Sequence, residues 1–463
     1  MGPLPKLFLI LSLLIFPAGC TYYHYPLNAP LERYDPDFGY KPKNMTKSTG
    51  DRDLLLMVTF SGGGTRAAAF SYGVLEALRD TRLLKGGREL RLLDEIDLIS
   101  GVSGGSFTAA YYGLFGDRTF QDFEQKFLKK DIQGELSSQI FFNPGNWTRL
   151  FSPYFDRSDL AAEYYDKNVF EGATFADLAR QPGPMILINA TDMVYGTRLA
   201  FTQDAFDIIC SDLSTFPVAR ACAASSAVPI LLTPITLKNY AGSCGFVPPA
   251  FLTKSLEARD LPDRQFDLSN NLAPFLDSGR KPYVHLVDGG VADNLGLRAL
   301  LERVIASGNI MTNLKTAKLE QVRKIAFIIV NAETEIDTKW DQSASIPPFA
   351  AMFDSYSSIA IFRYNIETVA LLREGFKQWT DEIRKGRCPE GQLSTAPGSC
   401  GDIEFYVVEV KFDALKDPAE RTFFKRLPTS FALPSEDVDK LRQAARRILE
   451  NSRDFQRLVR DLQ

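Results

Sequence analysis

The sequence predicts an α/β fold, a three-layer α/β/α arrangement in which helices cover both faces of a mostly parallel sheet. Apolar runs at 54–60, 96–100 and 324–331 have the length and composition of buried strands. The first two lead through a glycine-rich turn into a helix-like segment, which is the order of a parallel α/β unit. The 463 residues, 45% hydrophobic and 24% charged, are enough for a large globular core.

The first glycine-rich turn is Ser61-Gly62-Gly63-Gly64-Thr65-Arg66, and a predicted helix follows it over 67–78. A turn of this kind at a helix start presents unpaired backbone N–H groups and the positive end of the helix dipole. It is therefore a candidate site for the negative oxygen of a tetrahedral intermediate. Arg66 opposes the dipole at this position, so we expect it to have a functional role or an ion-pair partner.

The same glycines also match the loose dinucleotide fingerprint Gly-x-Gly-x-x-Gly/Ala over 62–67. That fingerprint needs an acidic residue at the end of the second strand, about twenty positions further on. Here the second strand ends in Gly101-Val102-Ser103-Gly104-Gly105 instead. We therefore expect no nucleotide cofactor, and since no metal-ligand spacing is present, no metal either.

The turn around Ser103 has the pattern of a nucleophile elbow, Gly-x-Ser-x-Gly. An elbow places the serine on a sharp turn between a strand and a helix, with its hydroxyl exposed. The strand-like run before it and the helix-like segment after it supply that order. Gly101 and Gly105 permit the tight turn and the approach of a substrate carbonyl. Ser103 is therefore the candidate nucleophile.

The candidate base is Asp288, which stands at the end of a predicted strand over 283–287 and begins Asp288-Gly289-Gly290. The chain has two histidines, His24 near the N-terminus and His285. His285 is three residues before Asp288, so in an extended strand the two side chains point to opposite faces. A Ser-His-Asp triad thus lacks a suitable histidine. A Ser103–Asp288 dyad remains, with a carboxylate whose pKa burial raises.

Together these motifs resemble the patatin-like phospholipase family over about residues 54–304. The resemblance rests on 61–66, 101–105, 288–290 and the Ala/Ser-rich stretch 220–229, with 73–78 and 294–296 in support. It implies a patatin-like fold and hydrolysis of lipid acyl esters by a Ser–Asp dyad without metal or nucleotide. Carried over, Ser103 is the nucleophile and Asp288 its base, and Gly62, Gly63 and Gly64 supply the oxyanion hole with Arg66 beside it.

Two other functions stay open from sequence. One is a thioesterase or carboxylesterase that uses the same dyad, because the shape of an acyl pocket is not readable from the chain. The other is a non-catalytic envelope lipoprotein that keeps the fold as a binding scaffold. A net charge of −4 argues against nucleic acid as a partner and against purely electrostatic attraction to anionic membranes. The expected partners are a membrane phospholipid or another lipid ester, and the membrane surface.

The N-terminus has the features of an export signal over residues 1–19. Lys6 precedes an apolar run that is too short to span a bilayer comfortably. Pro17-Ala18-Gly19-Cys20 resembles a bacterial lipoprotein processing site, although Pro17 departs from the usual leucine-like residue. The resemblance implies a lipidated Cys20 and a lipid-anchored protein of the cell envelope. Thr21 favours the outer membrane if the cell has one, and an ordinary cleaved signal peptide is the alternative.

Export permits disulfides, and five more cysteines follow Cys20. Cys388 and Cys400 bracket a loop rich in Pro, Gly and Ser, and we predict that they pair. The second predicted pair is Cys210 with Cys244, which leaves Cys222 as a buried thiol.

The predicted organisation is a tether or arm over 20–52, a catalytic domain over 53–304, and an α/β extension over 305–463 that is packed on it and ends in helices. Aromatic residues are concentrated in 117–175. We expect most of them to lie in the core, and the alternative is that some form a lid or an interfacial surface. We expect a long loop over 242–281 and a long helical region with an internal break over 348–379. After Pro434, apolar residues recur every seven positions and predict a packed amphipathic helix, with membrane contact as the alternative.

Overall fold

The structure is a computed structural model that describes residues 27–44, 53–228, 232–257, 263–335, 338–342, 344–388 and 394–463. The predicted signal peptide, Cys20 and the beginning of the predicted tether lie outside these residues. None of the helices in the described ranges is both long and apolar enough to cross a membrane.

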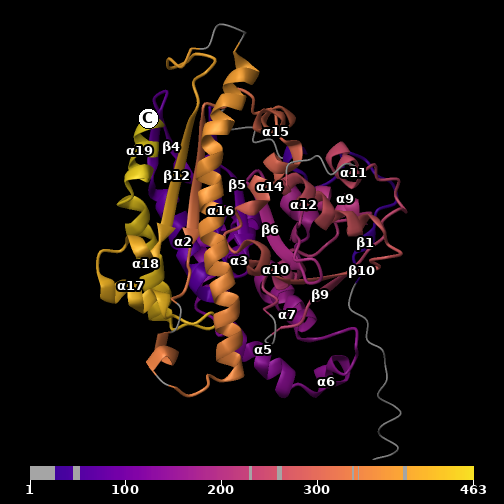
Figure 1. Cartoon of the computed structure of the whole chain (residues 1–463). Coiled ribbons are helices and arrows are strands. Elements are labelled where there is room, and N and C mark those ends of the chain that lie inside the picture. The colour runs from indigo at the N-terminus through magenta and orange to yellow at the C-terminus, as the bar shows by residue number, and fades with distance from the viewer. Residues whose placement is uncertain are drawn as a thin grey trace, which may run out of the picture.

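An eight-stranded sheet forms the centre of the molecule (Figure 1). Its order is β12-β11-β2-β5-β6-β10-β9, with β7 paired to β6. The first five strands in this order are parallel to one another, whereas β10, β9 and β7 join by antiparallel pairing. The bounds are β2 Leu54–Phe60, β5 Ile96–Val102, β6 Met185–Asp192, β7 Arg198–Ala200, β9 Ile235–Lys238, β10 Tyr283–Asp288, β11 Lys324–Asn331 and β12 Glu404–Lys411.

Helices cover both faces of this sheet, as the apolar composition of its strands requires. Alternate residues of β2 point to opposite faces: Leu56 and Val58 belong to one core, and Met57 to a second. The first core is covered by α2 (Gly64–Asp80), α3 (Gly104–Phe115), α10 (Val218–Ser225) and α18 (Ser435–Glu450). The second is covered by α14 (Arg298–Ser307), α15 (Ile310–Thr316) and α16 (Phe349–Arg387). The predicted mostly parallel α/β/α fold is confirmed.

Shorter elements complete the described part of the chain. The remaining helices are α4 Thr119–Phe123, α5 Ile132–Phe141, α6 Pro144–Leu150, α7 Arg157–Tyr165, α8 Phe175–Ala179, α9 Gln203–Ile208, α11 Ala250–Glu257, α12 Asp263–Leu272, α13 Gly290–Asp293, α17 Pro418–Lys425 and α19 Arg453–Asp461. Strands β3 (Arg82–Lys85) and β4 (Arg88–Arg91) form a hairpin, and β1 (Ala29–Pro30) pairs with β8 (Ser211–Asp212).

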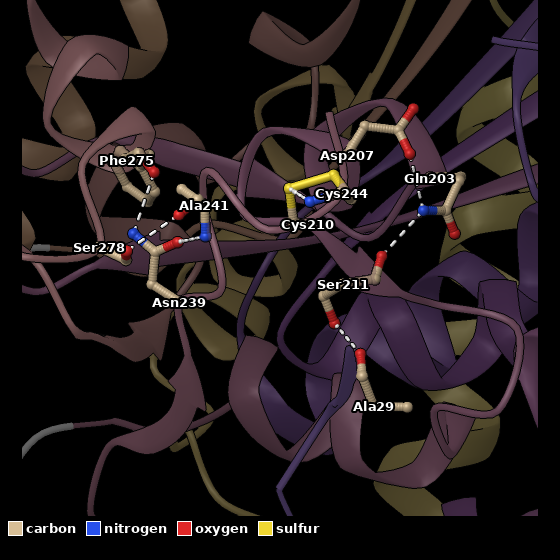
Figure 2. Close-up of a disulfide and its surroundings, with 10 residues drawn as sticks. All are labelled: Ala29, Gln203, Asp207, Cys210, Ser211, Asn239, Ala241, Cys244, Phe275 and Ser278. Atoms are coloured by element: carbon tan, nitrogen blue, oxygen red, sulfur yellow. Dashed lines mark hydrogen bonds between the residues drawn. A yellow bond between two sulfur atoms is a disulfide. The ribbon is translucent and has the colours of Figure 1, made fainter. Parts of the chain in front are cut away.

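The two predicted disulfides and the buried Cys222 thiol are confirmed. Figure 2 shows Cys210–Cys244, which ties the turn after α9 to the loop after β9, while the Ser211 hydroxyl donates to the Ala29 carbonyl at 2.8 Å. Lys41 forms a buried ion pair with Asp207 at 2.6 Å. Residues 27–44 therefore pack on the body of the protein as an arm.

Two expectations about local structure are wrong. The stretch 242–281 contains α11 and α12 and is not one long loop. Helix α16 has no internal break, since it is helical throughout 349–387. At the C-terminus, α18 and α19 share the seven-residue stripe, and Leu441, Ile448, Phe455 and Leu462 are all buried, so the stripe packs on the core as predicted.

Candidate active site

Ser103 lies between β5 and α3 in a backbone conformation that few residues other than glycine adopt, with φ 48° and ψ −123°. This is the strained turn that a nucleophile elbow requires. Two bonds hold the turn: the Ser103 amide donates to Ser225 Oγ at 2.8 Å, and the Ser106 hydroxyl donates to the Ser103 carbonyl at 2.6 Å. The strand–turn–helix order predicted around Ser103 is therefore present.

Strand register explains why Asp288 lies beside Ser103. Strands β5 and β10 flank β6 on opposite sides, and β5 runs parallel to β6 whereas β10 runs antiparallel. Val102 at the end of β5 is paired with Asn189, and Asp288 at the end of β10 is paired with the next residue, Ala190. The two strands thus end at the same level of β6, and Ser103, which directly follows β5, hydrogen-bonds the Asp288 carboxylate there.

Burial determines the charge state of Asp288, which is 8% exposed. Loss of water raises the pKa of its carboxyl group to about 6, although hydrogen bonds from the Gly290 amide and the Ser103 hydroxyl act in the opposite direction. The Gly290 amide donates to Asp288 Oδ1 at 2.7 Å. At neutral pH the group is therefore mostly ionised, yet basic enough to accept a proton.

The glycine loop lies directly against the elbow. A Cβ atom added to Gly104 would stand 1.9 Å from the Gly64 carbonyl oxygen, and one added to Gly62 would stand 3.4 Å from Ser103 Cβ. Gly63 and Gly64 have φ values of 135° and 57°, which side chains rarely allow. The structure thus brings the predicted oxyanion loop to the predicted nucleophile.

The set of donors in this loop is smaller than the sequence suggests. The Gly62 amide already donates to the Asn294 carbonyl at 3.0 Å, and the Thr65 amide donates to the Ser430 carbonyl at 2.9 Å. Within the described ranges, no acceptor is bonded to the amides of Gly63 and Gly64. Gly62 is therefore a support for the loop, and Gly63 and Gly64 are the available donors to an oxyanion.

Arg66 lies beside the glycine loop, as expected, since a Cβ atom added to Gly63 would stand 2.8 Å from its Nη2. It is 2% exposed, and its guanidinium donates to the carbonyls of Ala332 at 2.9 Å and Leu427 at 2.6 Å and to Thr429 Oγ1 at 3.0 Å. In the described part of the chain no carboxylate pairs with it. Arg66 therefore fastens the C-terminal extension to the start of α2, and the expected ion pair is absent there.

Sequence reasoning missed two residues that hold this site together. The Ser225 hydroxyl accepts from the Ser103 amide and donates to the Asn189 carbonyl at 2.6 Å. Asn294 bonds the glycine loop through its carbonyl, and its side-chain oxygen would lie 2.6 Å from a Cβ at Gly62. Both residues stand in stretches that carry the family resemblance, which was the available signal, but their contacts join distant segments.

His285 does not take part in the contact between Ser103 and Asp288. Its Nδ1 lies 3.0 Å from Thr236 Oγ1 on the neighbouring strand β9, and burial lowers the pKa of its imidazole. No group of three or more His, Cys, Asp or Glu side chains that could hold a metal ion is found among the described residues. The groups that converge at the elbow are a serine, a carboxylate and backbone amides.

Fold and site together define an α/β protein with the arrangement of a serine hydrolase. The family model "Patatin-like phospholipase" matches residues 58–301, more than half of the chain. The chain therefore belongs to the patatin-like phospholipase family, whose members are lipid acyl hydrolases. A search of curated protein sequences found no match.

Among solved structures, human GIVD cytosolic phospholipase A2 is similar, with a TM-score of 0.44 and 13% identity over 91% of this chain and 64% of that chain. The complex of the same human protein with methyl gamma-linolenyl fluorophosphonate has a TM-score of 0.40 and 13% identity over 89% of this chain and 59% of that chain. VipD from Legionella pneumophila has a TM-score of 0.24 and 11% identity over 92% of this chain and 72% of that chain. The chain thus spans less than two thirds of the length of the human structures.

Replacement of Ser225 by alanine should lower kcat about tenfold with little change in KM. The substitution leaves the buried Ser103 amide without its acceptor, a loss of about 1–3 kcal/mol that falls on the backbone of the elbow. Steady-state kinetics with a soluble ester measure the effect. Ser226→Ala is the matched control, because the Ser226 hydroxyl donates only within its own helical turn, to the carbonyls of Cys222 at 2.8 Å and Ala223 at 3.4 Å. Equal losses in both variants would contradict the positioning role of Ser225.

Activity should depend on a single group with a pKa near 6. Burial raises the pKa of Asp288 to about 6, and only the ionised carboxylate accepts a proton, so kcat/KM should fall about tenfold per pH unit below that value. A pH–rate profile with a soluble ester measures this. His285→Gln should leave the profile unchanged, and a profile that shifts or flattens in His285→Gln would assign the titration to the histidine instead.

Proposed function

We propose that this protein is a serine lipid acyl hydrolase that cleaves acyl esters of phospholipids or lysophospholipids through a Ser103–Asp288 dyad. One observation carries the proposal: a hydroxyl on a strained elbow contacts a buried carboxylate of raised pKa, beside two backbone amides without an acceptor among the described residues. Family membership supports the lipid substrate class.

In the proposed reaction, Asp288 takes the proton of the Ser103 hydroxyl while its oxygen attacks the ester carbonyl carbon. The amides of Gly63 and Gly64 donate to the resulting oxyanion, an interaction for which each donor is typically worth about 10²–10³ in turnover. The tetrahedral intermediate collapses, and the leaving alcohol takes the proton from Asp288. Water then attacks the acyl-enzyme, again with Asp288 as base, and the fatty acid leaves as Ser103 regains its proton.

A fluorophosphonate probe tests the activated serine directly, because it reacts with a serine only when a base has enhanced its nucleophilicity. We expect the wild-type protein to be labelled and Ser103→Ala to remain unlabelled. Absence of labelling in both would favour the scaffold alternative. A panel of phospholipids, acyl thioesters and short-chain esters then separates a phospholipase from a thioesterase or carboxylesterase using the same dyad.

We also propose that Cys20 carries the lipid that anchors the protein to the cell envelope, since the sequence around it resembles a lipoprotein processing site. Mass spectrometry of the N-terminal peptide of the protein isolated from membranes tests this. An unmodified N-terminus downstream of Cys20 would support an ordinary cleaved signal peptide.

A further inference from the structure

Helix α16 is much longer than the sheet on which it packs. Its 39 residues extend for about 58 Å at about 1.5 Å per residue, whereas an eight-residue strand such as β11 spans about 26 Å. The helix connects β11 to its parallel neighbour β12. It therefore begins at the edge of the sheet where the parallel strands end (Figure 1). Ser103 lies at the same edge, since it directly follows the last residue of β5.

The later part of α16 carries all its fully buried side chains, whereas the described side chains of the first part are half-buried or exposed. Its buried side chains are Asn365, Thr368, Leu372, Trp379 and Ile383, and none of the described side chains from 349 to 364 is buried. The first part of the helix therefore projects beyond the sheet by about 24 Å. An isolated helix of that length is marginal in water, because most helical stability comes from the packing of an apolar face.

The projecting part has an apolar face where a solvated helix would be charged. Residues spaced three or four apart line one side of it, opposite the packed side, and are between 36% and 80% exposed. These residues form what we call the apolar stripe: Phe349, Met352, Tyr356, Ile359, Phe362 and Ile366. Asp354 is the one charged residue from 349 to 362, whereas charges return to the exposed side from Arg363 onward, at Glu367, Arg373 and Glu374. The change coincides with the point where the helix leaves the body.

A second exposed apolar surface lies at the same edge. It is formed by the aromatic residues of α5 and α6 and of the turn after each helix, Phe141, Phe142, Trp147 and Phe151, which are between 47% and 84% exposed. The Ile132 amide at the start of α5 donates to the Phe431 carbonyl at 3.1 Å, next to Ser430, whose carbonyl binds the start of α2. Figure 1 shows α5, α6 and the beginning of α16 at one end of the molecule.

We propose that the apolar stripe and the aromatic residues of α5 and α6 insert together into the interfacial region of a lipid bilayer and bring the Ser103 edge onto its substrate. This inference rests on the proposed function. Exposed aromatic and aliphatic side chains suit the boundary between headgroups and acyl chains. The attraction is hydrophobic and not electrostatic, in accord with the net charge of −4.

The flanking residues favour a bilayer over a second copy of the chain. Helices that pair through a stripe of this spacing usually carry charged residues on both sides of it, which set partner and orientation. Here the flanking positions before the helix reaches the body hold Phe353, Ser355 and Ala360, and the first exposed charge on this side is Arg363. A surface without such charges has no means to select a partner helix, whereas a bilayer requires none.

The direct test places a fluorescent reporter on the stripe. In a chain with Cys20→Ser and Ser103→Ala, Tyr356→Cys is labelled with nitrobenzoxadiazole, and Glu374→Cys on the packed part of α16 is the matched control. We expect phosphatidylcholine vesicles to raise the emission severalfold and shift it to the blue at 356 only, equally at low and high salt. No response at 356 would overturn the proposal. A rise that follows protein concentration without vesicles would overturn it too, in favour of self-association.

An activity test separates this proposal from the proposed function. The triple variant Met352→Ser, Tyr356→Ser, Ile359→Ser should lose about tenfold or more of its turnover on phosphatidylcholine vesicles, because it loses apolar area for the bilayer. Its turnover of a soluble ester and its labelling at Ser103 should remain. Leu84→Ser with Val247→Ser, two exposed apolar residues elsewhere, is the control. Unchanged turnover on vesicles would overturn the proposed membrane-binding surface and leave the proposed function intact. A wild-type protein that is not labelled at Ser103 would overturn the proposed function.

Discussion

Ser103→Ala and Asp288→Asn should each reduce turnover by about 10⁴-fold or more, because a nucleophile and its base act as one unit. The double variant should be barely worse than either single variant for the same reason. The residual activity is what the amides of Gly63 and Gly64 and substrate binding supply. Initial rates with a soluble ester and with phospholipid vesicles measure the loss. An Asp288→Asn enzyme with substantial turnover would exclude the dyad.

The stability of Asp288→Asn shows whether its loss of activity is chemical. The folded protein raises the pKa of Asp288 from 3.8 to about 6, so the protonated carboxyl favours folding below about pH 4, and this contribution is lost as pH rises through about 6. At pH 8 the ionised, buried group then opposes folding by at most about 3 kcal/mol. Asparagine removes that charge, so thermal unfolding at pH 8 should show a variant at least as stable as the wild type.

The elbow and the aspartate could be predicted because each depends on a few neighbouring residues. Glycines at fixed offsets from Ser103, with a strand before and a helix after, determine the local turn whatever the rest of the chain does. Asp288 at a strand end beside two glycines is equally local. The exclusion of His285 needed only the two-residue period of a strand. These inferences required no knowledge of which strands are neighbours.

The donors of the glycine loop could not be predicted, because their competitors come from far along the chain. The Gly62 amide is bonded to Asn294, and the Thr65 amide to Ser430, more than two hundred residues away. Arg66 likewise binds the carbonyls of Ala332 and Leu427. The cost that a cation has at a helix start indicated that Arg66 has a special partner, but not that the partners are backbone carbonyls of the C-terminal extension.

The local structure of two segments was predicted wrongly from the sequence. The stretch 242–281 is rich in Pro, Asp and Asn, yet α11 begins directly after Pro249, and proline is well suited to a helix start. In α16 the sequence holds no proline between 349 and 387, and buried Leu372 and Trp379 hold the later turns against the sheet. The helix therefore continues through the position where a break was predicted.

Gly104→Ala should lower turnover by about 10²–10³ and destabilise the fold by about 1–3 kcal/mol. Alanine normally favours a helix over glycine by about 1 kcal/mol, but here the added Cβ would stand 1.9 Å from the Gly64 carbonyl oxygen. Relief requires that elbow and oxyanion loop separate by about 1 Å, and an error of that size costs about 10² in rate.

Kinetics, fluorophosphonate labelling and urea unfolding of Gly104→Ala measure this separation. The matched control is Gly183→Ala, since a Cβ at Gly183 meets no atom within 4 Å and its φ is not positive. It should keep full activity and stability. We expect Gly104→Ala to be labelled slowly at Ser103, because the nucleophile and Asp288 remain while the Gly63 and Gly64 amides move away from the oxyanion. Full turnover by Gly104→Ala would mean that these amides do not act on the reacting carbonyl.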